Sequence, residues 1–340
     1  MREKVTREHV AKLAGVSPAV VTWVKNGSAH KHRISESTIE KVEALILELG
    51  YKPSIWGKLI NTQRSGLIAF ISFDITDPSA NELIRQLGVV ARERGYGLLL
   101  YDLAGMGMDV DALLKNLDNS LADAFILHLP EDNLLALCAD DHFHQRPVCV
   151  VGRDLDRPDL CSIEVDNVLG ARISMEHALS LNPARLGVIS DQPKFEYTRQ
   201  RAVGYAAALD AGPGLEVPRY TRRDDQDQFM AGQAAMESWL AAGRLPDVFI
   251  AMADVLAIGA LSALSQRGMA APKDIKAVGF DGTIFSRYAC PPLTTVAQPY
   301  DVMARDAIDK CHRLLNRQDV GERKILRRPT LLIRDTTRTD

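Results

Sequence analysis

Apolar residues near the start of the chain recur at the spacing of an α-helix. Val10, Leu13 and Ala14 follow the i, i+3, i+4 rule for one buried stripe, and Thr6 is a suitable N-cap before them. Gly15 follows the stripe, and glycine readily adopts the positive φ of a tight turn between helices. The pattern predicts a short helix that ends at a glycine turn.

A second helix is predicted directly after this turn. Ser17 is a preferred N-cap, and proline is tolerated at the next position because its missing N–H would have no helical partner. Val21 and Val24 are spaced to pack inward, with Val16 between the two helices. The outward face then carries Pro18, Ala19, Thr22, Trp23 and Asn26. Such a face fits the DNA major groove, although a plain helical hairpin explains these residues equally well.

A third helix favours the DNA-binding interpretation. It is predicted to begin at Ser35 or Ser37, where Ser37 and Glu40 fit a reciprocal capping box. Its apolar stripe consists of Ile39, Val42, Ile46 and Leu49. Because three helices can enclose a small core, the pattern predicts an all-α helix-turn-helix head.

From Gly66 onward, short apolar runs alternate with amphipathic stretches. The predicted strands are 67–72, 97–103, 123–129, 148–152, 185–190, 247–252 and 275–280. Helices are predicted between them, for example 82–94, which Gly95 closes. Strands that alternate with helices form parallel sheets covered on both faces. Two such sets, before and after about residue 165, predict an α/β body of two similar lobes with a cleft between them.

Charge divides the chain at the same place. Residues 1–64 carry 11 lysines and arginines against 6 acidic residues, whereas the rest of the chain carries 30 against 38. A basic head on an acidic body suits phosphate binding by one end only, which the overall net charge of −3 conceals.

Composition narrows the class of protein further. A length of 340 residues, with 46% hydrophobic and 25% charged residues, is typical of a soluble protein with more than one domain. The five cysteines lack metal-binding or redox spacing, so we expect reduced core thiols. The first residues are charged and no apolar run approaches 18 residues, so we expect neither secretion nor membrane insertion but a cytoplasmic protein.

Motifs along most of the chain resemble those of the lactose-repressor (LacI) family of bacterial transcription regulators. The segment 50–71, GYKPSIWGKLINTQRSGLIAFI, keeps the family residues Gly50, Tyr51, Pro53, Ser65, Gly66 and Ile68. Further matches are AGVSP at 14–18, Asp166 with Asn167, RAVGYAAAL at 201–209, VGFDG at 278–282 and PPLTTVAQP at 291–299. In this order and spacing the motifs are highly specific, although each alone is weak.

The resemblance implies three parts of the chain. These are a helix-turn-helix DNA-binding domain (1–52), a hinge helix and linker (53–65), and a two-lobed, periplasmic-binding-protein-like domain for effector binding and dimerisation (66–340). The chain of such a body crosses between its lobes three times, and we expect the crossings near Asp166, Leu293 and Ile325. The N-lobe would comprise about 66–165 and 294–325, and the C-lobe about 166–293 and 326–340.

The head is then expected to contact DNA. The candidate residues are Thr6, Ser17, Pro18, Ala19, Val20, Thr22, Trp23, Asn26, Lys31, Arg33 and Tyr51. Family members usually carry an arginine at the position of Trp23, where it grips guanine with two hydrogen bonds; an indole offers one donor and a large apolar face. We expect Trp23 to contact thymine methyls or sugars, unless it only packs against Lys25 and the neighbouring loop. In that loop, 27–33, His30 and His32 join Lys31 and Arg33 as phosphate contacts or as solvated residues.

The hinge is expected to fold in the minor groove of bound DNA. Its candidate contacts are Ser54, Gly57, Lys58 and Ile60. Ile60 stands at the position of the family's wedge leucine, which kinks the duplex, and Lys58 stands where arginine is common. Gly57 stands where alanine is usual, and glycine costs about 0.5–1 kcal/mol relative to alanine in a helix, so ordering of this hinge should depend more strongly on the operator.

The cleft is expected to bind a small effector. Arg201 matches the family arginine that clamps ligand oxygens with its planar fork of donors, and Asp281 matches the aspartate that accepts from ligand donors. Asp166 and Gln298 stand at other cleft-facing positions, although Asp77 and Gln298 are equally explained as a helix cap or a surface pair. The remaining candidates are Phe73, Ser79, Ala80, Ala253 and Asp254.

Departures from the family pattern change the expected pocket. Ser79 and Ala80 stand where two aromatics are common, and Ala253 stands where an asparagine is common. The pocket would lose a stacking platform and a hydroxyl partner, and would be wider or would use Tyr197, Asp227 and Phe229 instead. A sugar or sugar derivative remains the expected effector.

These features together imply a sequence-specific transcription regulator, expected to be a repressor, whose effector changes the angle between the lobes and so the affinity for DNA. The expected partners are double-stranded, palindromic operator DNA, the effector and a second copy of the chain; no cofactor, metal or membrane is expected. The segment LLIRDTTRTD has no apolar heptads, which predicts a dimer without a tetramer-forming coiled coil.

Two other classes of protein remain as alternatives. A periplasmic sugar-binding protein would share the body but not the basic head. An α/β enzyme would be supported by Gly105 and Gly107 after a strand, but the third glycine of a dinucleotide site is missing. His142, His144 and the acidic run 224–227 have no partners at metal or catalytic spacing, so no enzyme activity is predicted.

Overall fold

The computed structural model describes residues 5–51, 64–107, 109–118, 121–140, 146–153, 155, 157–209 and 215–338. The chain separates into two compact units, Met1–Ser65 and Gly66–Asp340, called here the head and the body. The hinge candidates Ser54, Gly57, Lys58 and Ile60 lie outside the described residues.

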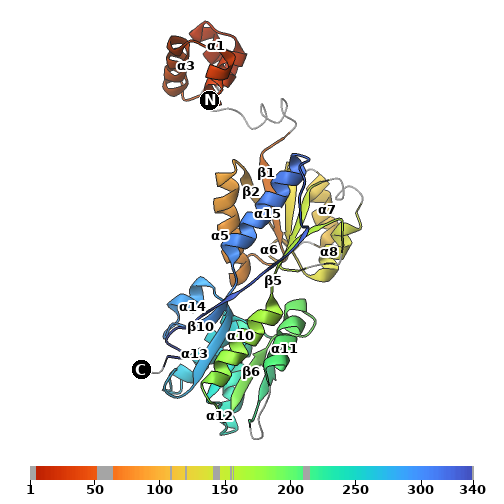
Figure 1. Cartoon of the computed structure of the whole chain (residues 1–340), viewed down its shortest axis with the longest axis vertical. Helices are drawn as coiled ribbons and strands as arrows, with labels where there is room; N and C mark the ends of the chain where they lie inside the picture. Colours follow the sequence, from red (N-terminus) through yellow and green to blue (C-terminus); the bar gives the residue numbers. More distant parts are fainter. Residues whose placement is uncertain are drawn as a thin grey trace. The chain divides into compact units, whose positions relative to one another are not determined.

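The head consists of α1 (Arg7–Ala14), α2 (Pro18–Lys25), the 3₁₀ helix η1 (Ala29–His32) and α3 (Glu36–Glu48) (Figure 1). The hydroxyl of Thr6 accepts the N–H of His9, and Gly15 adopts a φ of 73° and donates to the carbonyls at the end of α1. The predicted N-cap at Thr6 and the predicted glycine turn at Gly15 are therefore confirmed. Val21 and Val24 are buried as predicted, and a single core joins the three α-helices.

Two details of the head differ from the prediction. Leu13 is 49% exposed, and Ala11 is buried instead, because α2 and α3 both pack against α1 and turn its buried face toward Ala11. The cap of α3 is Ser35, whose hydroxyl accepts the N–H of Thr38. The helix begins at Glu36, so Ser37 lies inside its first turn and the predicted capping box is wrong.

The N-lobe of the body is a six-stranded, fully parallel sheet in the order β11-β5-β4-β3-β1-β2. Its strands are β1 (Leu67–Ser72), β2 (Gly97–Asp102), β3 (Ala124–His128), β4 (Val148–Val151), β5 (Cys161–Val165) and β11 (Lys324–Arg327). Its helices are α5 (Pro78–Glu93), α6 (Leu103–Met106), α7 (Val110–Asp118), α8 (Glu131–Cys138) and α15 (Tyr300–Leu315). α5 and α15 pack together over one face, and α7 and α8 cover the other (Figure 1).

The C-lobe repeats this plan with the order β12-β10-β9-β8-β6-β7. Its strands are β6 (Leu186–Ser190), β7 (Arg219–Thr221), β8 (Val248–Ala251), β9 (Lys276–Asp281), β10 (Thr294–Ala297) and β12 (Thr330–Leu332). β12 pairs antiparallel to β10, and the other pairs are parallel. The helices are α10 (Asn167–Ser180), α11 (Glu196–Ala208), α12 (Gln228–Ala241), α13 (Asp254–Ser265) and α14 (Ile284–Tyr288), and α10, α12 and α13 contribute most of the helical side chains in the core beside the sheet.

The crossings between the lobes differ in part from those expected. The first follows Val165, at the expected place near Asp166. β10 belongs to the C-lobe sheet, so the second crossing follows Ala297, one strand later than the expected boundary near Leu293. β11 belongs to the N-lobe up to Arg327, so the third crossing lies two residues beyond Ile325, between Arg327 and Thr330. The buried threonines of β10 hold the chain in the C-lobe, because they bond to the interior of that lobe.

Three further observations complete the comparison with the sequence. α5 begins at Pro78, four residues before the predicted start, because the Asp77 carboxylate caps it by accepting from the N–H groups of Ser79 and Ala80. Four cysteines are buried, but Cys290 is exposed, so the expectation of a core thiol is wrong there. Among the described residues, no helix is long and apolar enough to cross a membrane.

Candidate functional site

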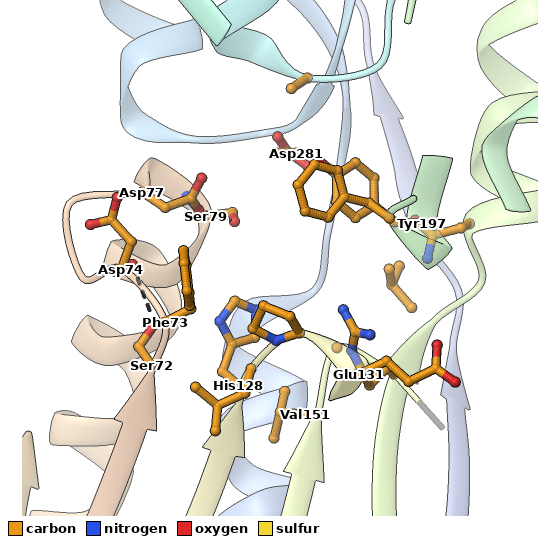
Figure 2. A pocket seen from close by; sticks show the side chains of 18 of the residues that line it. Ser72, Phe73, Asp74, Asp77, Ser79, His128, Glu131, Val151, Tyr197 and Asp281 are labelled. Atoms are coloured by element: carbon orange, nitrogen blue, oxygen red, sulfur yellow. Dashed lines mark hydrogen bonds between the residues drawn. The ribbon is translucent and has the colours of Figure 1, made fainter. Parts of the chain in front are cut away.

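A cavity of about 810 Å³ lies between the two lobes of the body. Ligands of parallel sheets bind at the carboxyl ends of the strands, and Ser72, His128 and Val151 end β1, β3 and β4 at this cavity. Asp281 ends β9 and faces the cavity from the C-lobe. Figure 2 shows Phe73, His128 and Glu131 on the N-lobe side and Tyr197 and Asp281 on the opposite side.

The sequence identified part of this lining. The predicted effector residues that line the cavity are Phe73, Asp77, Ser79, Tyr197, Arg201, Ala253, Asp281 and Gln298. Those that do not line it are Ala80, Asp166, Asp227, Phe229 and Asp254.

Arg201 is the central cation of the C-lobe wall. It is 3% exposed, and its Nε donates to Oδ1 of Asn167 at 2.9 Å. Its other nitrogens donate to the carbonyl of Met252 and, at 3.3 Å, to Oδ1 of Asp281. The guanidinium lies 3.5 Å from the centroid of the Phe280 ring, where a cation–π interaction stabilises it. Arg201 is therefore held rigidly at the cavity wall with most of its donors in use.

Asp281 lies in the same wall, where burial and the neighbouring Arg201 have opposite effects on its pKa. It also accepts the side-chain N–H of Gln298 at 2.8 Å, and its backbone has a φ of 115°, a region that non-glycine residues rarely adopt. Burial raises the pKa of Asp281 to about 7, against the opposing effect of Arg201. Asp281 is thus placed to exchange a proton near neutral pH and to accept from a ligand donor.

Asp254 lies behind the wall rather than in it. This fully buried carboxylate accepts from the N–H and hydroxyl of Thr283, at 2.8 and 3.0 Å, and from the hydroxyl of Thr295 at 2.6 Å. Burial raises its pKa to about 6. Asp254 therefore does not line the cavity, and it ties α13 to the loop after Asp281.

The other four misplaced candidates have local structural roles. Asp166 caps α10 by accepting from Leu169, and Asp227 caps α12 by accepting from Met230. Ala80 is fully buried inside α5, and Phe229 lies in the first turn of α12, beside α13 and away from the cavity. A short carboxylate just before a helix is a preferred N-cap, and this bonding directs both aspartates toward their own helices.

Sequence reasoning missed a second network in the C-lobe wall, centred on Asp191. This fully buried carboxylate accepts from the hydroxyl of Tyr197 at 2.6 Å, from Nε of Arg222 at 2.5 Å and from the amide of Gln228 at 2.9 Å. Burial, with the charge of Asp191, raises the pKa of Tyr197 well above its usual value. Asp191 directly follows β6 and Arg222 directly follows β7, and this position was the signal that could have identified both.

Aromatic rings line the same wall. Phe195 and Tyr197 stack with centroids 5.6 Å apart and planes 10° from parallel, and both line the cavity. Phe73, 47% exposed, contributes a ring from the N-lobe. Stacking surfaces are thus present in spite of Ser79 and Ala80, but they come from other segments of the chain.

The N-lobe wall also carries residues that were not predicted. His128 and Arg153 line the cavity at the ends of β3 and β4, and burial lowers the pKa of both side chains. Within the described part of the chain, no group of three or more His, Cys, Asp or Glu side chains is arranged to hold a metal ion.

The head presents the predicted outer face of α2. Ala19, Asn26, Lys31 and Arg33 are exposed. Ser17 is the N-cap of α2, but its hydroxyl makes no capping hydrogen bond within the described residues. Pro18, Val20, Thr22 and Trp23 are partly buried, as is Tyr51 beside the core of the head. Thr22 donates its hydroxyl to the carbonyl of Pro18 at 3.2 Å.

Both units match known families. Residues 7–54 match the bacterial regulatory proteins of the lacI family, and residues 175–337 match the periplasmic binding protein-like domain. The HTH-type transcriptional repressor CytR of Escherichia coli K12 is 28% identical over 336 residues, covering 98% of this chain and 96% of the relative. The Ribose operon repressor of the same strain is 28% identical over 338 residues, covering 97% and 98%.

Solved structures agree with the fold. A lac repressor dimer bound to operator and the anti-inducer ONPF has a TM-score of 0.78 at 24% identity, covering 98% of this chain and 99% of that one. A complex of the transcriptional regulator CelR with cellobiose has a TM-score of 0.68 at 26% identity, with the same coverage. The expected fold class, a helix-turn-helix head with a two-lobed α/β body, is confirmed. The head thus carries a DNA-binding domain of the lacI family and the body a periplasmic binding protein-like domain, and along nearly the whole chain the protein is similar to repressors of the LacI type.

Proposed function

We propose that this protein is a cytoplasmic transcriptional repressor that binds a palindromic operator as a homodimer and is controlled by a small, sugar-like effector. The observation that carries the proposal is the presence, in one chain, of a helix-turn-helix head and a cavity with charged side chains in its walls. Relatives named as repressors, and solved structures with operator, ONPF or cellobiose, support it.

DNA would meet the head along α2. The hydroxyl of Ser17 has no cap bond to give up, so it is suited to a phosphate oxygen at the start of the helix. Ala19 and Asn26 project from the outer face, where side chains reach base edges in the major groove. Lys31 and Arg33 would add contacts to the phosphate backbone.

Effector binding would act on contacts that join the two lobes. Glu82 of the N-lobe accepts the backbone N–H of Ile284 at 3.1 Å, and Glu164 accepts the amide of Gln200 at 2.7 Å. Glu131 lies 3.8 Å from Arg199 across the mouth of the cavity. A ligand that bonds to both walls favours one angle between the lobes over another, and can shift DNA affinity only by that difference.

Dimerisation would use the apolar surface of α14. Ile284, Phe285 and Tyr288 are exposed by 47%, 55% and 71%. A cluster of large apolar side chains on one short helix marks a protein–protein contact more often than an ordinary solvent face. No catalytic role is proposed, since the charged residues of the cavity form a binding wall.

The direct test is binding of the full-length protein to the DNA upstream of its own gene. We expect specific binding. The logarithm of the association constant should fall linearly with the logarithm of the salt concentration, with a slope of about −0.9 for each phosphate neutralised. Sugars and nucleosides are then added to find a compound that changes the affinity. Equal binding to shuffled DNA of the same composition would contradict the proposal.

A further inference from the structure

Arg153 stands apart from the other cations of the cavity. It follows β4 by two residues, lines the cavity and is partly buried. Within the described residues, no hydrogen bond or ion pair reaches its guanidinium, and burial lowers its pKa. A buried guanidinium needs acceptors, since leaving it without them costs free energy.

The other cations that line the cavity have acceptors from the protein. Arg201 and Arg222 donate to Asp281 and Asp191, and Lys194 donates to Asp224 at 3.1 Å. Arg199 donates to the carbonyls of the segment before α11, both at 2.9 Å. Arg153 is therefore the lining cation that a ligand reaches without first breaking a bond to the protein.

His128 provides a second donor next to Arg153. Its ring packs against Gly152, where an added Cβ would lie 3.1 and 3.2 Å from Cδ2 and Nε2 of the ring. Within the described part of the chain its ring nitrogens make no hydrogen bond. Burial and the charge of Arg153 lower the pKa of His128, against the effect of Asp77, so the neutral ring keeps one N–H donor at pH 7.

We propose that Arg153 and His128 form a subsite for an anionic group of the effector, which is then a sugar acid or a sugar phosphate rather than a neutral sugar. A carboxylate or a phosphate supplies two parallel acceptors to the guanidinium and a third contact for the imidazole. The acids whose charges attract Arg153 have other partners: Glu131 and Glu196 face Arg199, and Glu164 accepts the amide of Gln200. Asp77 caps α5. The inference rests on the proposed control by a small effector in this cavity.

The test compares the full-length protein with three variants. Arg153→Gln removes the cation, and His128→Phe removes the donor but keeps a ring against Gly152. Arg157→Gln is the control, because Arg157, four residues after Arg153, pairs with Asp159 and does not line the cavity. The probes are ribose, glucose and galactose, their aldonic acids, their terminal phosphates and inorganic phosphate, and the readouts are the shift in melting temperature and the Kd by calorimetry.

At least one anionic probe is expected to raise the melting temperature of the wild type and of Arg157→Gln. Arg153→Gln should bind that probe about 10- to 100-fold more weakly, and His128→Phe a few-fold more weakly. Without ligand, Arg153→Gln should melt close to the wild type, because it loses no hydrogen bond or ion pair to the described residues and the attraction of Glu131 is opposed by the cost of burying the cation. The proposal is overturned if no anionic probe binds the wild type, if only neutral sugars bind, or if Arg153→Gln responds to every probe as the wild type does.

A separate measurement distinguishes this failure from failure of the proposed function. Operator binding of the ligand-free protein does not depend on the subsite, so Arg153→Gln should bind DNA as the wild type does. If the wild type binds DNA but no anionic probe, the subsite alone is rejected. Anion binding without any DNA binding rejects the proposed function and leaves the subsite in place.

Discussion

Trp23 stacks face to face on His32, with ring centroids 3.9 Å apart and ring planes 8° from parallel. His32 ends η1, so this short helix covers one face of the Trp23 indole, which projects from α2. Of the two interpretations of Trp23, packing against the neighbouring loop is therefore present, with His32 of that loop as a partner. Contact of the indole with a base stays a prediction, since the other face and the edge of the ring are not used by this stack.

Removing the stacked imidazole should weaken DNA binding without unfolding the head. A stacked aromatic pair contributes about 0.5–1.5 kcal/mol, so His32→Ala is expected to lower operator affinity about 2- to 10-fold by releasing the indole. The measurement is a binding titration at constant salt, with the helical signal of the head as a check on folding.

His30→Ala is the matched control for this experiment. His30 lies in the same 3₁₀ helix, and its side chain is 70% exposed, 3.9 Å from Glu36. Its removal should leave affinity nearly unchanged. Equal losses in the two variants would mean that the loop acts through charge or phosphate contact and not through the stack on Trp23.

Trp23→Arg should change the base preference of the protein. An arginine at this position can donate two hydrogen bonds to guanine, and each such pair discriminates by about 1–3 kcal/mol, whereas the indole favours apolar edges such as thymine methyls. Binding-site selection with the wild type and the variant should therefore show a new guanine preference at one position of each half-site. An unchanged selected sequence would show that residue 23 does not read bases.

The unusual pKa of Asp281 gives a measurable pH dependence. The carboxyl group titrates near 3.9 in an unfolded chain and at about 7 in the folded protein. Between these values the folded state binds more protons than the unfolded state, so the free energy of unfolding falls as pH rises from about 4 to about 7. Compared with Asp281→Asn, which cannot titrate, the wild type should lose stability across this interval.

The readout is the difference between the two unfolding curves, measured by denaturant at several pH values. This difference removes the opposite effect of carboxylates elsewhere whose pKa is lowered, such as Glu216 beside Arg185. A difference that stays constant from pH 4 to pH 8 would mean that Arg201 keeps Asp281 ionised throughout. In that case the ion pair outweighs burial.

The cavity shows how far sequence reasoning reaches in this protein. Arg201 and Asp281 do lie at its wall, as expected from the motifs that they share with the LacI family; Asp281 ends β9, and Arg201 lies in the second turn of α11. Asp166 and Asp227 were misplaced, because the same residue type before a helix is also its natural cap, and local hydrogen bonding decides between the two roles.

What could not be predicted depends on contacts between distant parts of the chain. Periodicity indicated the strands with long apolar runs, but β7 and β12 have three residues each and are defined by the neighbours with which they pair. Arg153 and His128 come together only because β3 and β4 are adjacent in the sheet. Whether Arg153 has an acceptor is a property of the folded cavity, and no local pattern shows it.

Phe285→Asp should convert the protein to a monomer and weaken operator binding strongly. Phe285 is 55% exposed on α14 beside the more exposed Tyr288, so a charge there would be buried without a partner in a dimer but solvated in a monomer. Two linked heads bind one palindrome with a large gain from effective concentration, which a monomer loses, and we expect at least about a 100-fold fall in affinity. Leu135→Asp is the control, since Leu135 is 47% exposed on α8, far along the chain from α14. Sedimentation of both variants measures the mass directly; a dimeric Phe285→Asp, or a monomeric Leu135→Asp, would place the dimer contact elsewhere on the body.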